Sequence, residues 1–406
     1  MNTNQNGRRT RVLIVGGGIA GMTAAIALHK AGLTPEVFEA YARSADGVGA
    51  FLTLAVNGIE ALRAIDVEVD GLGGFATPRM ELYLGNGQLL TGFDFGTPGA
   101  SGLVARTIRR ADLYAALRRE GDRRGIAVRY GKELASATPR ADGVVARFAD
   151  GSEAEGDLLV GADGLRSRVR RIIDPNAPNA RYVGLLNAGG YCRGVRVPGE
   201  VGTLRLYFGK HSFFGYVPSP DGDIWWFANP ARRQEPTPAE LRALTTQAWR
   251  AELLALFAAD VTPARAIIEG TADIFAGWPT YDFPKVPIWH RDRMLIIGDA
   301  AHATSPSSGQ GASMAIEDGV VLAKALRDAP DVAGACASYE SARRERVERV
   351  VAEGKKSGDG KTPGAFGRVV RDTALRLIFS GKARRNPWRF LDERRIDWTS
   401  PLVEAR

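Results

Sequence analysis

The chain has 406 residues, which is too long for one ordinary hydrophobic core and predicts two or three packed units. Its composition, 45% hydrophobic and 25% charged with a net charge of +8, is that of a soluble globular protein. The polar, basic opening is no signal peptide and no run of roughly 18 apolar residues occurs, so we expect a cytoplasmic protein without a membrane span.

Residues 11–39 have the pattern of a βαβ unit. The β-branched run 11–15 predicts a strand that stops at three glycines, and the Ala- and Leu-rich run 19–31 predicts a helix. Gly32 is the expected C-cap of this helix, and residues 36–39 predict the next parallel strand.

The glycines of this unit fit the fingerprint G-x-G-x-x-G of dinucleotide-binding folds. Gly16 permits the turn, Gly18 lets the backbone approach a pyrophosphate, and Gly21 lets helix and strand pack closely. Free N–H groups at the helix start would hold the pyrophosphate, and Glu39, 23 positions after Gly16, would accept ribose hydroxyls. A merely structural Gly-rich turn is the alternative, and the fingerprint does not choose between NAD and FAD.

Two more strand-to-loop junctions follow. Residues 158–160 form a buried-type run that ends at Gly161-Ala-Asp163-Gly164, and residues 293–297 form another that ends at Gly298-Asp299. Helical spacing occurs at 57–65, 111–124 and 309–326, and residues 144–149 and 153–160 predict a hairpin around Asp150-Gly151. The third junction indicates that the chain returns to its first domain.

Residues 181–277 have a different character. Short aromatic and β-branched runs at 204–208, 212–217 and 224–228, broken by Pro and Gly, predict a sheet-based insert. The run 237–258 predicts a helix that covers one face of this sheet. Two amphipathic helices, 335–354 and 366–379, are expected after it, separated by a flexible run at 355–364.

The excess positive charge lies near the C-terminus, where residues 340–395 hold 16 Lys or Arg against 8 Asp or Glu. Such a patch can bind nucleic acid, but no aromatic-interleaved basic groove and no helix-turn-helix pattern accompanies it. We therefore expect a solvated helical face and no nucleic-acid partner. The four histidines and the two cysteines, Cys192 and Cys336, lack metal-ligand spacing, so no metal site is expected and both thiols should be buried and inert.

A resemblance to a known family is carried by the third junction. The segments Gly298-Asp-Ala-Ala-His302, Pro306-Ser-Ser-Gly-Gln-Gly311 and Ala315-Ile-Glu-Asp318 resemble the flavin-binding segment of class A flavoprotein monooxygenases. That family includes p-hydroxybenzoate hydroxylase, salicylate hydroxylase and the tetracycline-inactivating oxygenases. The resemblance implies that FAD is the cofactor.

The resemblance also implies roles for individual residues. Asp299 would bind the ribityl chain of FAD, and the backbone from Pro306 through Gly309 and Gly311 to Ala312 would lie beside the isoalloxazine ring. A helix that begins near Gly309 to Gly311 would stabilise the negative charge that reduced flavin carries at its N1–C2=O edge.

Four further matches complete the expected flavin site. Asp163, in Gly161-Ala-Asp-Gly-Leu-Arg-Ser-Arg-Val169, matches a segment tied to FAD and NAD(P)H use, and Arg110 matches an FAD-contacting arginine, with Arg109 as its rival. Arg43 is the expected early FAD contact, and the segment from Gly47 to Asn57 matches one near the flavin ring but lacks the proline often found before that asparagine. The structural alternatives are ordinary turn aspartates for Asp163 and Asp299 and an exposed first-turn residue for Arg110.

The expected fold is α/β, with a Rossmann-like FAD-binding domain, an inserted mixed β-sheet substrate domain and C-terminal helices. The FAD-binding domain is assigned to 1–75, 101–180 and 278–330, the substrate domain to 181–277 and the C-terminal helical region to 331–406. Residues 76–100 are expected to be strands that join the substrate sheet.

With one dinucleotide fingerprint, NADPH or NADH would bind transiently at the surface. The resemblance implies that it reduces FAD, that the flavin reacts with O2, and that a flavin C4a-hydroperoxide transfers oxygen to a small aromatic or polycyclic metabolite by hydroxylation or epoxidation. We expect a monomer or homodimer with a small-molecule substrate. No general base is identified in the sequence.

The substrate would lie between the flavin and the aromatic insert. The candidate wall residues are Phe213, Phe214, Tyr216, Trp225 and Trp226, of which we select Phe214, Tyr216 and Trp226. Trp225 and Trp226 would point to opposite faces of a strand, so at most one of them faces the pocket. For each aromatic residue, plain core packing is the alternative.

Other functions share this fold. A prenyl-chain reductase would form product without oxygen, and a flavin-dependent halogenase would carry a Trp-x-Trp-x-Ile-Pro segment, which is not found. The non-enzymatic alternative is a flavin-binding protein without turnover that acts as a stabiliser or partner of another enzyme.

Overall fold

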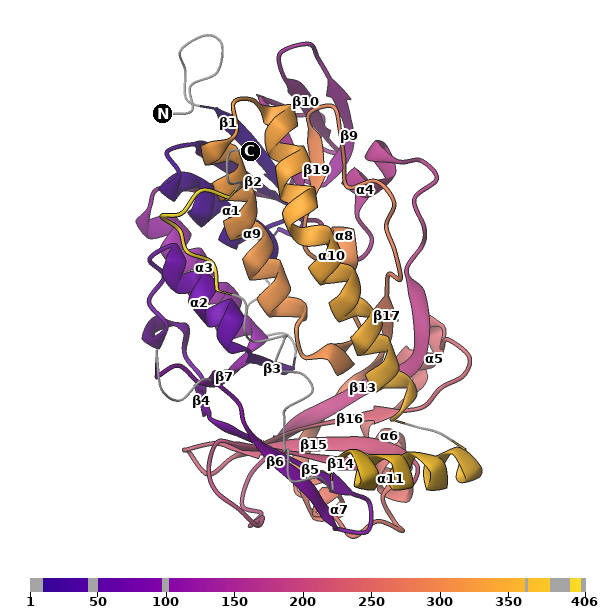
Figure 1. The fold of residues 1–406 in the computed structure, drawn as a ribbon. Coiled ribbons are helices and arrows are strands. Elements are labelled where there is room, and N and C mark those ends of the chain that lie inside the picture. Colours follow the sequence, from indigo (N-terminus) through magenta and orange to yellow (C-terminus); the bar gives the residue numbers. More distant parts are fainter. Residues whose placement is uncertain (1–9, 43–49, 97–101, 362–363, 380–394, 403–406) are drawn as a thin grey trace.

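The computed structural model describes residues 10–42, 50–96, 102–361, 364–379 and 395–402, and Figure 1 shows the chain as two layers joined by one long helix. The α/β fold expected from the sequence, with a Rossmann-like domain, a mixed sheet and C-terminal helices, is confirmed. Among the helices of these ranges, none is both long and apolar enough to cross a bilayer.

The first layer is built on a six-stranded sheet. Its order is β18 (His290–Arg291), β19 (Met294–Ile296), β12 (Leu158–Gly161), β1 (Arg11–Val15), β2 (Thr34–Glu39) and β8 (Ala127–Tyr130). All neighbours pair in parallel except β18 with β19. Because the strands run the same way, the three glycine-containing junctions that follow β1, β12 and β19 meet at one edge of the sheet.

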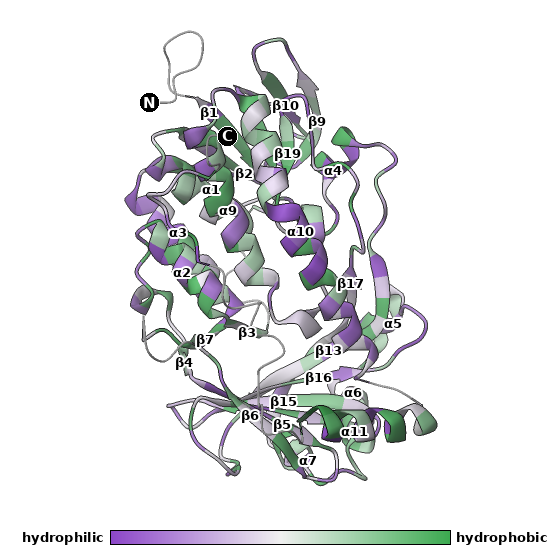
Figure 2. Cartoon of the chain, in the orientation of Figure 1, coloured by the Kyte–Doolittle hydropathy of each residue, from purple (hydrophilic) through white to green (hydrophobic). Residues whose placement is uncertain are grey.

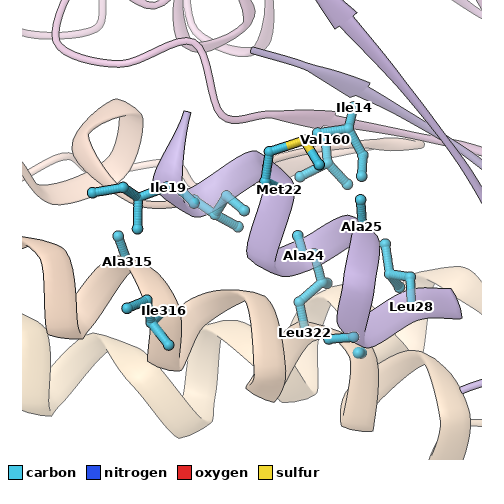
Figure 3. Close-up of a cluster of buried hydrophobic side chains, with 14 of the residues drawn as sticks. Ile14, Ile19, Met22, Ala24, Ala25, Leu28, Val160, Ala315, Ile316 and Leu322 are labelled. Carbon is cyan, nitrogen blue, oxygen red and sulfur yellow. The ribbon is translucent and has the colours of Figure 1, made fainter. Parts of the chain in front are cut away.

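Helix α1 (Ile19–Lys30) lies between this sheet and helix α9 (Gly311–Asp328). Figure 3 shows Met22 and Ala25 directed at Ile14 and Val160 of the strands, while Ile19 and Ala24 face α9. Gly319 lets the two helices approach closely, since a Cβ there would lie 2.6 Å from the backbone nitrogen of Ala24. This packing explains why α1 is apolar on all sides.

Short elements complete the first layer. The small sheet of β9 (Leu134–Pro139), β10 (Val144–Phe148) and β11 (Glu153–Gly156) contains the predicted hairpin, and its Phe148 stacks on Phe38 of β2 with ring centroids 4.6 Å apart. A second small sheet, β3 (Phe51–Leu54), β7 (Ala105–Arg109) and β4 (Phe75–Thr77), leads to the other layer. The remaining helices are α2 (Val56–Ala64), α3 (Arg110–Arg123), α4 (Arg168–Ile173) and α8 (Asp299–His302), with short 3-10 turns at Asp70–Leu72 and Pro306–Ser308.

The second layer is a seven-stranded sheet. Its order is β17 (Thr271–Asp282), β13 (Arg181–Cys192), β16 (Ile224–Pro230), β15 (Ser212–Pro218), β14 (Thr203–Phe208), β5 (Arg79–Leu84) and β6 (Leu89–Asp94). The sheet is mixed, because β5 pairs with β14 in parallel and the other neighbours are antiparallel. Strands from residues 79–94 therefore stand at its edge.

Three helices cover the outer face of this sheet. They are α5 (Pro238–Ala243), α6 (Thr246–Leu256) and α7 (Ala264–Glu269). The single helix expected over 237–258 is wrong, because Thr237 and Thr245 each cap a separate helix with the side-chain oxygen. Trp249 and Leu253 of α6 bury their side chains against the sheet.

The C-terminal helices connect the layers. Helix α10 (Val332–Asp359) runs along both, and α11 (Ala365–Phe379) lies beside the edge strand β6, where Figure 2 shows hydrophobic residues along much of the helix. The flexible run expected at 355–364 is wrong for residues 355–359, since α10 continues to Asp359. The expected burial of Cys192 and Cys336 as free thiols is confirmed, and burial raises the pKa of Cys336 to about 12.

Candidate active site

A cavity of about 1240 Å³ lies where the two layers meet. One side is formed by the carboxyl ends of the strands of the first layer, and the other by the inner face of the seven-stranded sheet. The sequence-predicted residues that line it are Gly16, Gly18, Glu39, Arg110, Asp163, Asp299, Pro306, Gly309, Gly311 and Ala312. Arg43 lies outside the described residues.

The glycine turn fits tightly against its surroundings. Gly16 has a φ of +103°, and a Cβ there would lie 2.4 Å from the carbonyl oxygen of Ala162. A Cβ on Gly21 would lie 1.9 Å from the carbonyl oxygen of Gly16, so Gly21 is required for packing and not for lining the cavity. Gly18 is the N-cap of α1, which leaves the N–H groups of the first helical turn facing the cavity.

Glu39 closes this end of the cavity. Its Oε2 accepts a hydrogen bond from the Gly17 N–H at 2.7 Å, and its Oε1 accepts one from the Tyr41 N–H at 3.0 Å. The carboxylate is thereby fixed beside the glycine turn, and its remaining lone pairs can accept hydrogen bonds from a ligand hydroxyl.

The structure separates the two neighbouring arginines. Arg110, the first residue of α3, lines the cavity and donates to the Tyr114 hydroxyl at 3.3 Å. Arg109 lies with its guanidinium carbon 4.8 Å from the ring centroid of Tyr191 and 5.3 Å from that of Trp225. Arg110 is therefore the one placed to contact a ligand in the cavity.

Asp163 has a structural role as well as a place in the cavity. Its carboxylate accepts hydrogen bonds from the Ser167 hydroxyl at 2.5 Å and from the N–H of Arg168 at 2.7 Å. These bonds hold the start of α4, as in an ordinary turn aspartate. Burial raises the pKa of Asp163 above its usual value, against the lowering effect of these donors.

Asp299 begins the short helix α8 directly after β19. Its side chain is open to the cavity but surrounded by protein on its other sides, and this burial raises the pKa of Asp299. The charges of His302 and Arg110 partly oppose that shift. A carboxylate that opens into the cavity suits a ligand that supplies hydroxyl groups.

The segment from Pro306 to Ala312 forms a backbone cradle. Pro306–Ser308 is a 3-10 turn, Gly309 has a φ of +62°, and α9 begins at Gly311. Helix α10 supports the turn from behind, because a Cβ on Gly354 would lie only 2.9 Å from the Ser308 Cβ. The free N–H groups at the start of α9 therefore face the cavity on a rigid support.

A cluster of buried charges lies behind this cradle. Arg343 of α10 pairs with Glu317 and donates to an Asp318 oxygen at 2.7 Å, and all three side chains are fully buried. Asp318 also accepts a hydrogen bond from the Gly298 N–H at 2.8 Å. Asn57 donates to Glu317 at 2.7 Å, so the cluster ties α2, α9 and α10 to the loop that carries Asp299.

The three residues selected as the substrate wall lie on the face of the seven-stranded sheet that points away from the cavity. Phe214, Tyr216 and Trp226 are fully buried in the core on the outer side of the sheet, where α6 and α7 cover them. Phe213 of β15 and Phe227 of β16 line the cavity instead. Alternation predicts that adjacent residues face opposite sides, but the sequence does not reveal which side faces the ligand.

Sequence reasoning missed several polar residues in the cavity, among them Asn187 and Lys361. Asn187 of β13 lies on the inner face of the sheet, and Lys361 follows the end of α10. Neither belongs to a motif, and Lys361 falls in the run expected to be flexible. The sequence pattern ended the predicted helix at residue 354, whereas α10 continues to Asp359. A correct helix end would have placed Lys361 directly after an ordered helix.

The cavity fits FAD. At one end are a glycine turn, a helix N-terminus and Glu39, and at the other is a second backbone cradle at the start of α9. Asp299 and Arg110 lie between these ends and offer an acceptor for hydroxyls and a cation for phosphate. The phosphates, the sugar hydroxyls and the flavin ring edge of FAD need polar partners of these kinds.

Comparisons with known proteins agree with this arrangement. The protein family described as FAD binding domain matches residues 9–354. The aurachin C monooxygenase/isomerase of Stigmatella aurantiaca is 33% identical over 92% of this chain and 97% of its own length, and the FAD-dependent urate hydroxylase of Klebsiella oxytoca is 31% identical over 86% and 90%.

Solved structures show the same fold. The crystal structure of Klebsiella pneumoniae HpxO complexed with FAD and uric acid superposes with a TM-score of 0.77 at 27% identity, covering 94% of this chain and 95% of that one. The salicylate hydroxylase substrate complex has a TM-score of 0.74 at 22% identity and covers 92% and 96%. The chain therefore belongs to the class A FAD-dependent monooxygenases and is an enzyme of the aromatic hydroxylase type.

Proposed function

We propose that this enzyme consumes NADPH or NADH and O2 to hydroxylate or epoxidise a small aromatic or polycyclic molecule. The observation that carries the proposal is that one cavity joins the predicted flavin-binding residues to an aromatic sheet face. Relatives named for urate and for 6-hydroxynicotinate, both flat heteroaromatic rings, support this substrate class.

The first-layer residues hold the cofactor in this proposal. Gly16 and Gly18 admit the pyrophosphate to the start of α1, Glu39 accepts the ribose hydroxyls, and Asp299 accepts hydroxyls of the ribityl chain. Bound FAD supplies electron transfer from NAD(P)H to O2 and an activated oxygen atom. The start of α9 stabilises negative charge on the adjacent ring edge.

The second-layer sheet receives the substrate. Phe213 and Phe227 line the cavity, and Phe208 of β14 and Phe379 of α11 extend the apolar wall. Apolar walls exclude water and so protect a reactive oxygen species from hydrolysis. Flat aromatic molecules gain most from contact with such rings.

The nicotinamide cofactor has no fingerprint of its own in the sequence, so the proposal assigns it a transient surface site. Arg166, Arg168 and Arg171 lie at the rim of the cavity, next to Asp163, and offer positive charge to its phosphates. We propose that NAD(P)H approaches along this rim and donates hydride before the substrate reacts.

The test is oxygenation of a panel of phenols, quinolones and purines by the flavin-loaded enzyme under ¹⁸O2. The proposal predicts that at least one compound stimulates NADPH or NADH oxidation and gains one ¹⁸O atom, as measured by mass spectrometry. Product formed without O2 would indicate a reductase. No NAD(P)H oxidation at any substrate would contradict the proposal and indicate a non-catalytic flavin-binding protein.

A further inference from the structure

A buried lysine opens into the substrate end of the cavity. Lys361 follows the C-terminus of α10, is 5% exposed, and is one of the residues that line the cavity. Lysine is rarely buried without a carboxylate partner, because the ammonium group loses its hydration. Its position therefore calls for a functional explanation.

The described neighbours of the Lys361 amine are neutral. Its Nζ donates a hydrogen bond to the Asn229 Oδ1 at 2.6 Å and lies 4.2 Å from the ring centroid of Phe213. Among the ion pairs of the part of the chain that the structure describes, none includes Lys361. An anionic partner for the protonated amine would thus have to come from the ligand.

The partner of Lys361 is held in one orientation. Asn229 of β16 donates through its Nδ2 to the Asn187 Oδ1 at 2.7 Å, which leaves the Asn229 oxygen to accept from Lys361. Asn187 itself lines the cavity. A chain of hydrogen bonds therefore fixes the amine at the inner face of the sheet, beside Phe213.

The backbone of Lys361 is fixed as well. Arg371 of α11 donates to the carbonyl oxygen of Lys361 at 3.3 Å and to that of Phe208 at 3.2 Å. Because the guanidinium donors of Arg371 are engaged by these carbonyl oxygens, Arg371 fixes the backbone of Lys361. The side chain of Lys361 is therefore the cation that is placed to bind a ligand.

Burial lowers the pKa of Lys361 to about 7. Near neutral pH a substantial fraction of the side chain is therefore the free amine, which can accept a proton. An unperturbed lysine would be almost wholly protonated at that pH.

We propose that Lys361 is the general base and the anchor for an acidic hydroxyl group, a phenol or an enol, on the substrate. This inference rests on the proposed function, because it names the substrate class of the same cavity. The ring of the substrate would lie against Phe213 and Phe227, and its hydroxyl would lie at the Lys361 amine.

The proton transfer is balanced without another reagent. The substrate O–H bond breaks, the proton bonds to the lone pair of the Lys361 nitrogen, and the O–H electron pair stays on the oxygen. Delocalisation of that charge raises the electron density at the ring carbons ortho and para to it, which are the positions that an electrophilic oxygen attacks. The resulting ammonium and phenolate form a charge-assisted hydrogen bond in a cavity of low polarity.

The test uses the flavin-loaded enzyme and two probes, 4-nitrophenol and its methyl ether 4-nitroanisole, at a pH well below the pKa of the free phenol, where the unbound probe is protonated. The wild type should bind the phenol roughly tenfold or more tightly than the ether, and the bound phenol should show the visible absorption of its phenolate. Lys361→Met should bind both probes equally and without the phenolate band. Lys355→Met is the matched control, since Lys355 pairs with Asp359 on the same helix, and should behave as wild type.

Lys361→Gln provides a second variant if the Met variant does not fold, as judged by circular dichroism and bound flavin. A phenolate band that persists in both variants would overturn the proposal, and so would wild-type enzyme that binds the two probes equally or binds neither. Failure here is distinct from failure of the proposed function, because flavin content and NADPH oxidation are measured without either probe.

Discussion

At the scale of single residues, the buried carboxylates behind the backbone cradle of residues 306–312 share one guanidinium, that of Arg343. Arg343 serves both Glu317 and Asp318, and Arg346 adds a second cation to Glu317 at 2.9 Å. Removing one member of a buried ion cluster leaves the others without compensation for their lost hydration. The backbone cradle around Gly311 should therefore depend on Arg343, although Arg343 is not among the described residues that line the cavity between the two layers.

We expect Arg343→Met to lower the free energy of unfolding by about 3–5 kcal/mol, since two carboxylates would stay buried with less compensation. Urea unfolding followed by circular dichroism measures this difference. The control is Arg140→Met, whose ion pair with Glu155 is exposed and should contribute at most about 1 kcal/mol. Equal effects of the two substitutions would contradict the assigned role of the cluster.

The same cluster predicts how stability depends on pH. Burial alone would raise the pKa values of Glu317 and Asp318, but the charges of His302, Arg343 and Arg346 outweigh it, and both values are lowered. Groups with a lowered pKa contribute stability above the unfolded value of about 4 and lose it as the pH falls further. The loss of unfolding free energy caused by Arg343→Met should thus be large at pH 7 and shrink below about pH 4. Urea unfolding midpoints that show the same loss at pH 7 and below pH 4 would refute this.

Glu39 allows a direct test of cofactor binding at the residue scale. Glu39→Gln removes the charge that accepts the Gly17 N–H and, in the proposed function, the ribose hydroxyls. We expect the Kd for FAD to rise roughly tenfold or more, because charge-assisted hydrogen bonds to hydroxyls are lost. Quenching of flavin fluorescence on titration of the apoprotein measures it. Glu155→Gln, an exposed residue, should leave the Kd unchanged.

At the scale of elements, the contact between α1 and α9 sets the distance between the two backbone cradles. Gly319 makes this contact possible, since a Cβ there would lie 3.0 Å or less from backbone atoms of Ala24 and could not be relieved by a rotamer change. Both helices begin at the cavity, so a shift between them moves both ends of the cofactor site.

Gly319→Ala should destabilise the protein by about 1–3 kcal/mol through overpacking, despite the better helix propensity of alanine. Thermal and urea unfolding measure it. Gly358→Ala in α10 is the matched control, because its Cβ would make only an ordinary contact with the Ser307 Oγ at 3.5 Å, and it should be neutral or slightly stabilising. If Gly319→Ala left the free energy of unfolding unchanged, α1 and α9 could separate at little cost, and the assigned role of Gly319 would be contradicted.

The elements differ in how far the sequence predicts them. Strand β1 and the start of α1 follow from the apolar run 11–15 and the glycines, because periodicity and turn residues act locally. The end of α10 does not, since Gly354 and Gly358 read as helix breakers until their contacts with the Pro306–Ser308 turn are known. The inner face of β15 also stays undetermined, because alternation gives two faces and only the covering helices α6 and α7 decide between them.

At the scale of the whole molecule, the cavity lies at the junction of two layers, and the cofactor is expected to contact segments from residue 16 to residue 312. A ligand that binds only the folded state stabilises it by mass action, by about 2.7 kcal/mol at a concentration of 100 times its Kd. Adding FAD to apoprotein should therefore raise the Tm by several degrees, and AMP, which fills one end of the site, should raise it less. A Tm that does not respond to FAD would contradict the cofactor site.

The central claim is that this chain is a flavin enzyme reduced by NAD(P)H and reoxidised by O2. The most direct test is the visible spectrum of the purified, FAD-loaded protein, recorded without oxygen before and after addition of NADPH or NADH, and again after air is admitted. The account predicts a flavin spectrum that bleaches with one of the two nucleotides and returns with O2. Protein that binds no FAD, or bound flavin that neither nucleotide reduces with any compound of the substrate panel present, would contradict it.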